Sequence, residues 1–151
     1  MHHRLITVAA LVVAAGTAFA LTGCSDVADV LHHQTQGSYD SRAALEQAWS
    51  TPASEPDWIP ADATRLRMIA ATGGAGADAT PAVVRVRTAT ALPASCTEID
   101  RRSMDPFSLD WAPAKIPARV QRCGNWAVVP VSDGWYGWTP LTPDELGQHG
   151  R

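Results

Sequence analysis

The chain has 151 residues, 46% of them hydrophobic, and its formal net charge at pH 7 is −3. This length suits one small domain rather than several. The weakly acidic balance gives no overall attraction to nucleic acid, so no nucleic-acid partner is expected.

The N-terminus has the layout of a secretory signal. A basic head over residues 1–4 precedes an apolar run over residues 5–21, which is the order of the n-region and h-region. The run is short for a membrane-spanning helix and rich in small residues, and no Lys or Arg follows it until Arg42. We therefore favour a signal peptide over residues 1–23 and not a transmembrane helix.

The end of this run, Leu21-Thr22-Gly23-Cys24, resembles the lipobox of bacterial lipoproteins. The resemblance implies cleavage before Cys24 and acylation of its thiol, which would make membrane lipid a partner. Two acyl chains are enough for stable attachment. The expected location is the cell membrane, anchored by lipid on its extracytoplasmic face. An ordinary cleaved signal is the alternative, and the Gly-Cys pair fits it poorly.

The three cysteines are consistent with export. Acylation of Cys24 leaves Cys96 and Cys123, and an oxidising compartment favours a disulfide between them. Closing a loop of this length stabilises a fold by about 3.5 kcal/mol in the chain-entropy model. Two reduced, buried cysteines remain the alternative.

Residues 24–39 are mostly polar, and we interpret them as a lipidated flexible tether. A single domain is expected over residues 40–142 and a tail over residues 143–151. The spacing of apolar residues predicts a helix over 41–49, with Ser41 or Asp40 as its cap. Residues 97–104 are expected to form one helical turn.

Period-two alternation predicts strands over residues 64–72 and 83–90, joined by a glycine-rich connection. A further strand is expected over 115–122. The pair Asp133-Gly134 predicts a tight turn between strands over 125–131 and 135–138. The expected fold is α+β: a small antiparallel sheet of four or five strands, one N-terminal helix and one disulfide.

If the first two strands pair, four arginines share one face of the sheet: Arg65, Arg67, Arg85 and Arg87. Like charges so close together are unfavourable unless something offsets them. We favour an acidic side chain of the protein, and the nearby acids in sequence are Asp57, Asp62, Asp100 and Asp105. The alternative is an anion-binding strip that faces lipid headgroups, a wall polymer or an envelope protein.

Four aromatic residues gather near the C-terminus: Trp126, Trp135, Tyr136 and Trp138. Such rings can form a binding surface by stacking on sugars. In a small domain, however, they more often fill the core, and we favour that interpretation.

Catalytic and cofactor motifs are lacking. All five histidines lie in the signal, the tether or the last three residues, so a Ser-His or Cys-His pair has no base in the expected domain. No metal or cofactor is expected. The alternative is a wall-directed hydrolase that uses paired carboxylates, either Glu98 with Asp100 or Asp105 with Asp110.

Several short motifs in the domain together resemble small uncharacterised lipoproteins of high-GC Gram-positive bacteria. They are Trp58-Ile59-Pro60, Leu92-Pro93 before Cys96, Trp111-Ala112-Pro113 and Cys123-Gly124-Asn125-Trp126. The resemblance supports the membrane location and implies no chemistry. We therefore expect a binding or accessory module without catalytic activity.

Overall fold

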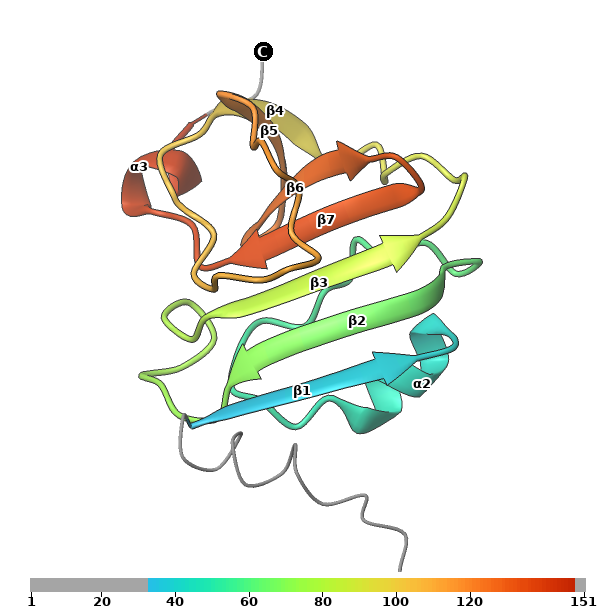
Figure 1. Ribbon diagram of the computed structural model, residues 1–151. Helices are drawn as coiled ribbons and strands as arrows, with labels where there is room; N and C mark the ends of the chain where they lie inside the picture. Colours follow the sequence, from blue (N-terminus) through green and yellow to red (C-terminus); the bar gives the residue numbers. More distant parts are fainter. Residues whose placement is uncertain (1–32, 149–151) are drawn as a thin grey trace, which may run out of the picture.

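A computed structural model of the protein describes residues 33–148 as a single antiparallel sheet with two short helices (Figure 1). The seven strands lie in the order β1-β2-β3-β7-β6-β5-β4. In chain order the elements are β1 (Gln34–Tyr39), α2 (Arg42–Ala48), β2 (Thr64–Ala71), β3 (Ala82–Arg87), β4 (Thr97–Asp100), β5 (Arg119–Cys123), β6 (Trp126–Val131), β7 (Gly134–Thr139) and α3 (Pro143–Leu146).

The antiparallel sheet, the N-terminal helix and the terminal hairpin were predicted, but the number of strands was wrong. The sheet has seven strands instead of four or five, so the protein is mostly sheet and fits an α+β description only loosely. The hairpin turn also comes one residue earlier, because Val131 pairs with Gly134 across it. Gly134 has φ 156° and no room for a Cβ, which would lie 2.2 Å from the carbonyl oxygen of Val86.

The two unexpected strands are β1 and β4. β1 lies in residues that were predicted to belong to the tether, and it pairs along its whole length with β2. Its side chains are polar or small and none is buried, so it lacks the apolar alternation of a half-buried strand. β4 replaces the expected helical turn because it pairs with β5. The predicted signal peptide and Cys24 lie outside the described residues.

The sheet buries apolar side chains on both faces. On one face, called here the helix side, α2 and the segment 49–63 cover β2 and β3, with Leu45 and Trp58 packed on Met68 and Val84. Ser41 caps α2 as predicted, since its Oγ accepts a hydrogen bond from Ala44 N. On the other face, called the loop side, the long connection 101–118 covers part of β6 and β7.

Cys96 and Cys123 form the predicted disulfide, with their sulfur atoms 2.04 Å apart. The sheet explains this pairing. Thr97 on β4 faces Arg122 on β5, so Cys96, just before β4, lies opposite Cys123, the last residue of β5. The bridge therefore fastens an edge strand to the body of the sheet.

The C-terminal segment, predicted to be a tail, folds back as α3. The buried carboxylate of Glu145 accepts five hydrogen bonds: from the backbone N–H of Arg102, Ser103 and Thr142, and from the hydroxyls of Ser103 and Thr142. Burial disfavours its charged form, but these donors outweigh that cost and lower the pKa of Glu145. Within residues 33–148, neither helix is long and apolar enough to cross a membrane.

Candidate functional site: an arginine cluster on the sheet

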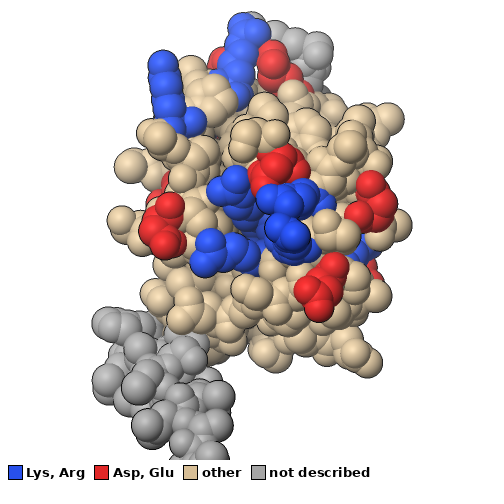
Figure 2. All heavy atoms as spheres, turned by 45° about the vertical axis from the view of Figure 1, so that its right-hand side comes forward, with Lys and Arg blue, Asp and Glu red and all other residues tan. Residues whose placement is uncertain are grey.

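The structure brings the four arginines named above together on the loop side, around a hollow of about 210 Å³. We call Arg65, Arg67, Arg85 and Arg87 the arginine cluster. Figure 2 shows a compact basic patch in the middle of one face of the molecule, with an acidic group directly against it. The connection 101–118 covers only part of this face, so the cluster stays open to solvent.

The pairing of β2 with β3 creates the cluster. Arg67 lies directly opposite Arg85, and the register between the two strands then shifts by one residue towards Thr64. This β-bulge contains Arg65, whose φ is 49°. A left-handed backbone is costly for a residue with a Cβ, and such strain is found mostly where a side chain is needed in a special direction.

Trp111, in the middle of the connection 101–118, holds two of the arginines. The guanidinium of Arg67 lies over the Trp111 ring, 5.3 Å from its centroid, in a cation–π contact. Arg85 donates a hydrogen bond of 2.8 Å to the backbone oxygen of Trp111. Trp111 itself packs edge-on against Tyr136. Trp111 therefore connects the hydrophobic core of the loop side to the arginine cluster and orients Arg67 and Arg85.

The acid that offsets the arginines is Asp133, in the β6–β7 turn. Its two carboxylate oxygens accept hydrogen bonds from Arg85 (3.0 Å) and Arg87 (3.1 Å). The hydrogen bond from Arg85 is the largest cause of the lowered pKa of Asp133. Local sequence patterns predict only a turn at Asp133, because it follows the arginines by more than forty residues and meets them only through the pairing of β3 with β7.

None of the four acids considered from the sequence reaches an arginine of the cluster through a hydrogen bond or ion pair in the described residues. Asp62 accepts hydrogen bonds from Thr88 and Thr90. Asp100 lies 3.7 Å from Arg119, and Asp105 accepts a hydrogen bond from the hydroxyl of Tyr136. Asp57 lines a small hollow beside the disulfide.

Within residues 33–148 the cluster therefore has excess positive charge. Four guanidinium groups and one carboxylate line the hollow, a formal charge of +3. Arg85 and Arg87 share Asp133, and the guanidinium of Arg67 lies over an uncharged ring. Among the described residues, the side chain of Arg65 makes no hydrogen bond or ion pair. Guanidinium groups with free N–H donors form a ready binding place for an oxyanion.

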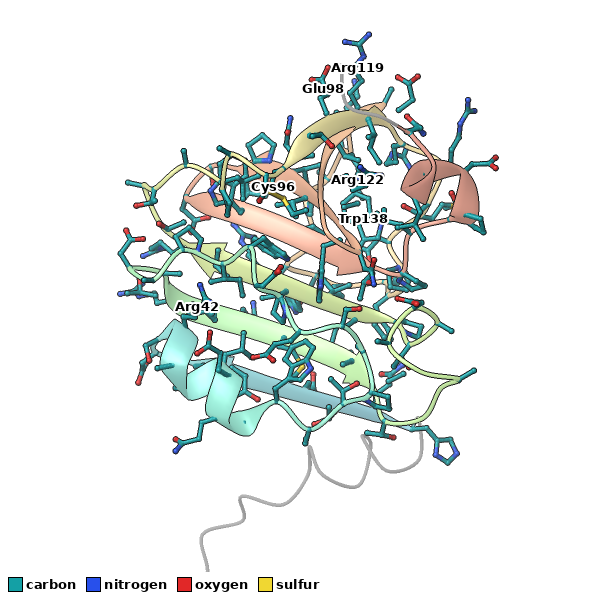
Figure 3. The ribbon with its side chains drawn as sticks, turned by 180° about the vertical axis from the view of Figure 1, so that it is seen from behind. Arg42, Cys96, Glu98, Arg119, Arg122 and Trp138 are labelled. Carbon is teal, nitrogen blue, oxygen red and sulfur yellow. A yellow bond between two sulfur atoms is a disulfide. The ribbon has the colours of Figure 1, made fainter. Side chains whose placement is uncertain are left out.

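The paired carboxylates that could have suggested a hydrolase are engaged elsewhere. Glu98 and Asp100 both approach Arg119 on the neighbouring strand, at 3.0 and 3.7 Å, and Figure 3 shows Glu98 beside Arg119 at the far edge of the sheet. Asp105 is bound to Tyr136, while Asp110 is exposed. Among the described residues no group of three His, Cys, Asp or Glu side chains is placed to hold a metal ion.

The aromatic residues near the C-terminus separate into two groups. Trp126, Tyr136 and Trp138 are at most 1% exposed and belong to the core, so they present no stacking surface. The Tyr136 hydroxyl is held by Asp105, and burial together with this contact raises the pKa of Tyr136. Only Trp135 is partly exposed.

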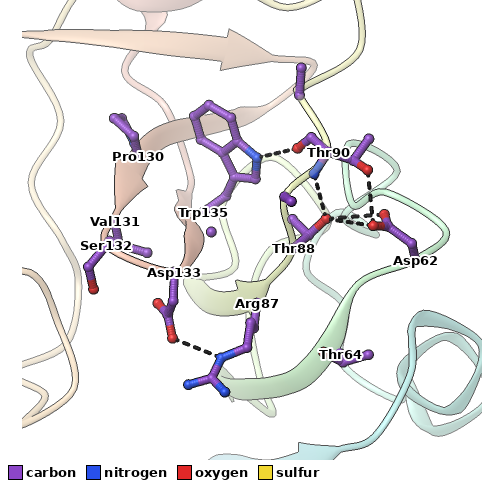
Figure 4. Close-up of a pocket in the computed structure, with 13 residues that line it drawn as sticks. Asp62, Thr64, Arg87, Thr88, Thr90, Pro130, Val131, Ser132, Asp133 and Trp135 are labelled. Carbon is purple, nitrogen blue, oxygen red and sulfur yellow. Dashed lines mark hydrogen bonds and ion pairs between the residues drawn. The ribbon is translucent and has the colours of Figure 1, made fainter.

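Trp135 lines a wide depression of about 790 Å³ that adjoins the arginine cluster (Figure 4). The indole lies beside Pro130, and its Nε1 donates a 2.9 Å hydrogen bond to the backbone oxygen of Thr90. Arg87 and Asp133 line both this depression and the hollow of the cluster. The two hollows therefore adjoin at the end of β3, with the cluster on the loop side and Trp135 on the helix side.

No protein-family model, curated protein or solved structure matches this chain.

Proposed function

We propose that this protein is a lipid-anchored binding module on the extracytoplasmic face of the cell membrane, and that its ligand is an oxyanion held by the arginine cluster. One observation carries the proposal. Four arginines converge on a solvent-open hollow in an otherwise acidic protein, with a single carboxylate among them.

Electrostatics supports an external anion. Cross-strand like charges destabilise a sheet, and Asp133 relieves only Arg85 and Arg87. Arg65 and Arg67 have no acidic partner in the described part of the chain. Arg65 also occupies a strained backbone position. An oxyanion bound by these two forks would supply the missing charge through short, charge-assisted hydrogen bonds.

The location rests on the lipobox resemblance at Cys24. The described domain begins at His33, and the residues between Cys24 and His33 can span at most about 30 Å when extended. An acylated Cys24 would thus keep the arginine cluster close to the membrane surface. Replacing Cys24 with Ala should release the protein from the membrane fraction. Unchanged fractionation would contradict the anchor.

Calorimetric titration of the purified full-length protein in detergent with inorganic phosphate, at low ionic strength, tests the binding site. The double variant Arg65→Gln/Arg67→Gln should bind phosphate at least about tenfold more weakly, because hydrogen bonds to charged groups are the strong ones. The matched control is Lys115→Gln/Arg119→Gln, which removes the same charge outside the cluster and should bind like the wild type.

Two results would contradict the proposal: no phosphate binding by the wild type, or equal weakening in both double variants. The second result would mean that overall charge, not the cluster, governs binding. Glu98 and Asp100 are bound to Arg119, and Asp105 is bound to Tyr136 while Asp110 is exposed. No observation on the described residues therefore favours the hydrolase alternative.

A further inference from the structure

We infer that the arginine cluster and the adjoining depression form one binding site for a sugar that carries a phosphate group. This inference rests on the proposed function and specifies its ligand. The cluster would take the phosphate, and the depression would take the hydroxyl-bearing ring.

The charge of the cluster favours phosphate among the oxyanions. A phosphate monoester carries about −1.5 to −2 charge at pH 7 and three acceptor oxygens. A carboxylate or a sulfate ester carries one negative charge and would leave more of the formal charge of +3 without compensation. Arg65 and Arg67, which have no acid partner in residues 33–148, supply donors in the planar arrangement that phosphate oxygens accept.

The polar rim of the depression favours a ligand with many hydroxyl groups. Asp62 accepts hydrogen bonds from the Thr88 and Thr90 hydroxyls at 3.0–3.1 Å. Thr88 Oγ1 also accepts a 3.0 Å hydrogen bond from Thr90 N, which fixes the rim in place. A carboxylate only accepts hydrogen bonds, and that of Asp62 has lone pairs beyond those used by Thr88 and Thr90, so it can accept hydrogen bonds from a ligand. Sugar hydroxyls supply both donors and acceptors.

Beside this rim, the depression has an apolar wall. Trp135 lies between Pro130 and Thr90 in Figure 4. The Trp135 ring is held by its hydrogen bond to the Thr90 backbone, so its orientation is set before a ligand binds. A rigid ring beside a polar rim suits a sugar, whose C–H face is apolar and whose edge is polar.

The place where the two hollows meet sets the shape of the ligand. Arg87 and Asp133 line both hollows. β3–β7 pairing places Trp135 opposite Val86, and both side chains pack on the helix side, so the ring lies on the other face of the sheet from the arginine cluster. A ligand that reaches both parts must therefore extend around the end of β3 past Arg87 and Asp133. A volume of about 790 Å³ falls within the range of small-molecule sites, about 300–1,000 Å³.

The test compares four ligands on the full-length protein in detergent: inorganic phosphate, glucose, glucose 6-phosphate and adenosine monophosphate. We expect glucose 6-phosphate to bind at least about tenfold more tightly than inorganic phosphate, and glucose alone to bind more weakly than both. Adenosine monophosphate should gain less than glucose 6-phosphate, because its base offers few donors to Asp62.

Two variants identify the surface that recognises the ring. Thr90→Val and Asp62→Asn change exposed side chains and should each lower the affinity for glucose 6-phosphate about threefold or more, with the affinity for inorganic phosphate unchanged. The matched control Thr72→Val alters an exposed threonine at the other end of β2 and should have no effect.

The outcomes separate the two proposals. If inorganic phosphate binds and glucose 6-phosphate binds no more tightly, the sugar inference is wrong and the oxyanion site stands. The inference also fails if adenosine monophosphate binds as tightly as glucose 6-phosphate, or if Thr90→Val and Asp62→Asn leave the gain intact. If neither phosphate nor glucose 6-phosphate binds, both proposals fail.

Discussion

Replacing Arg65 with glycine should make the protein more stable while it weakens anion binding. Arg65 lies in the β-bulge of β2 with φ 49°, in the left-handed region that costs about 1–2 kcal/mol for a residue with a Cβ. Glycine adopts this conformation without that cost. The substitution also removes one of four clustered like charges.

The expected gain is the relief of strain minus the entropy that glycine adds to the unfolded chain. That entropy is worth about 0.4–1 kcal/mol. The net result is a rise of about 0.5–1 kcal/mol in the free energy of unfolding, before any gain from reduced repulsion. A gain in stability from deleting a large side chain is unusual, since most substitutions destabilise.

The matched control is Arg67→Gly, two residues along the same strand. Arg67 loses the same charge, but its backbone is not in the left-handed region and its guanidinium packs on Trp111. Glycine inside a strand costs about 0.5–1 kcal/mol, so Arg67→Gly should destabilise.

Urea unfolding of both variants, with the disulfide intact, measures the two changes at pH 7. If Arg65→Gly lowers the free energy of unfolding as Arg67→Gly does, the bulge is not strained and Arg65 is held there for packing. If Arg65→Gly is more stable but binds phosphate as well as the wild type, the strain serves no binding role.

Three further predictions concern residues around this framework. Glu145→Gln should lower the free energy of unfolding by about 2–4 kcal/mol, because an amide cannot accept all the hydrogen bonds that the buried carboxylate accepts; urea unfolding measures this. The pKa of Glu145 is lower in the folded protein than in the unfolded chain. The stability that this carboxylate contributes is therefore complete above its unfolded pKa of about 4.3 and is lost as the pH falls through its folded pKa. The free energy of unfolding should consequently fall less steeply with acid in Glu145→Gln than in the wild type. Asp133→Asn should tighten phosphate binding about fivefold, because it removes about 1 kcal/mol of repulsion between the carboxylate and the bound phosphate. Weaker binding in a calorimetric titration would show that Asp133 mainly positions the arginines. Reducing the Cys96–Cys123 bridge should cost about 3.5 kcal/mol, measured by urea unfolding with and without reductant, and an unchanged midpoint would contradict the loop-closure account.

Local patterns in the sequence were sufficient for much of the sheet. Alternation predicted β2 and β3, and with them the shared face of the four arginines, because a period of two is a property of each strand alone. Cysteine counting predicted the Cys96–Cys123 pair, which the structure confirms. The outer strands β1 and β4 were missed because edge strands bury few side chains and show no strong alternation.

The sequence by itself determined which strands carry the arginines, which cysteines pair and, as a prediction, where the chain is anchored. Only the tertiary structure decided what surrounds the arginines. Pairing of β3 with β7 brings Asp133 to the cluster and Trp135 to the adjoining depression, and the connection 101–118 brings Trp111 to the cluster. These contacts join residues far apart in the chain, and such pairing depends on packing across the whole sheet, which no local period of hydrophobicity records.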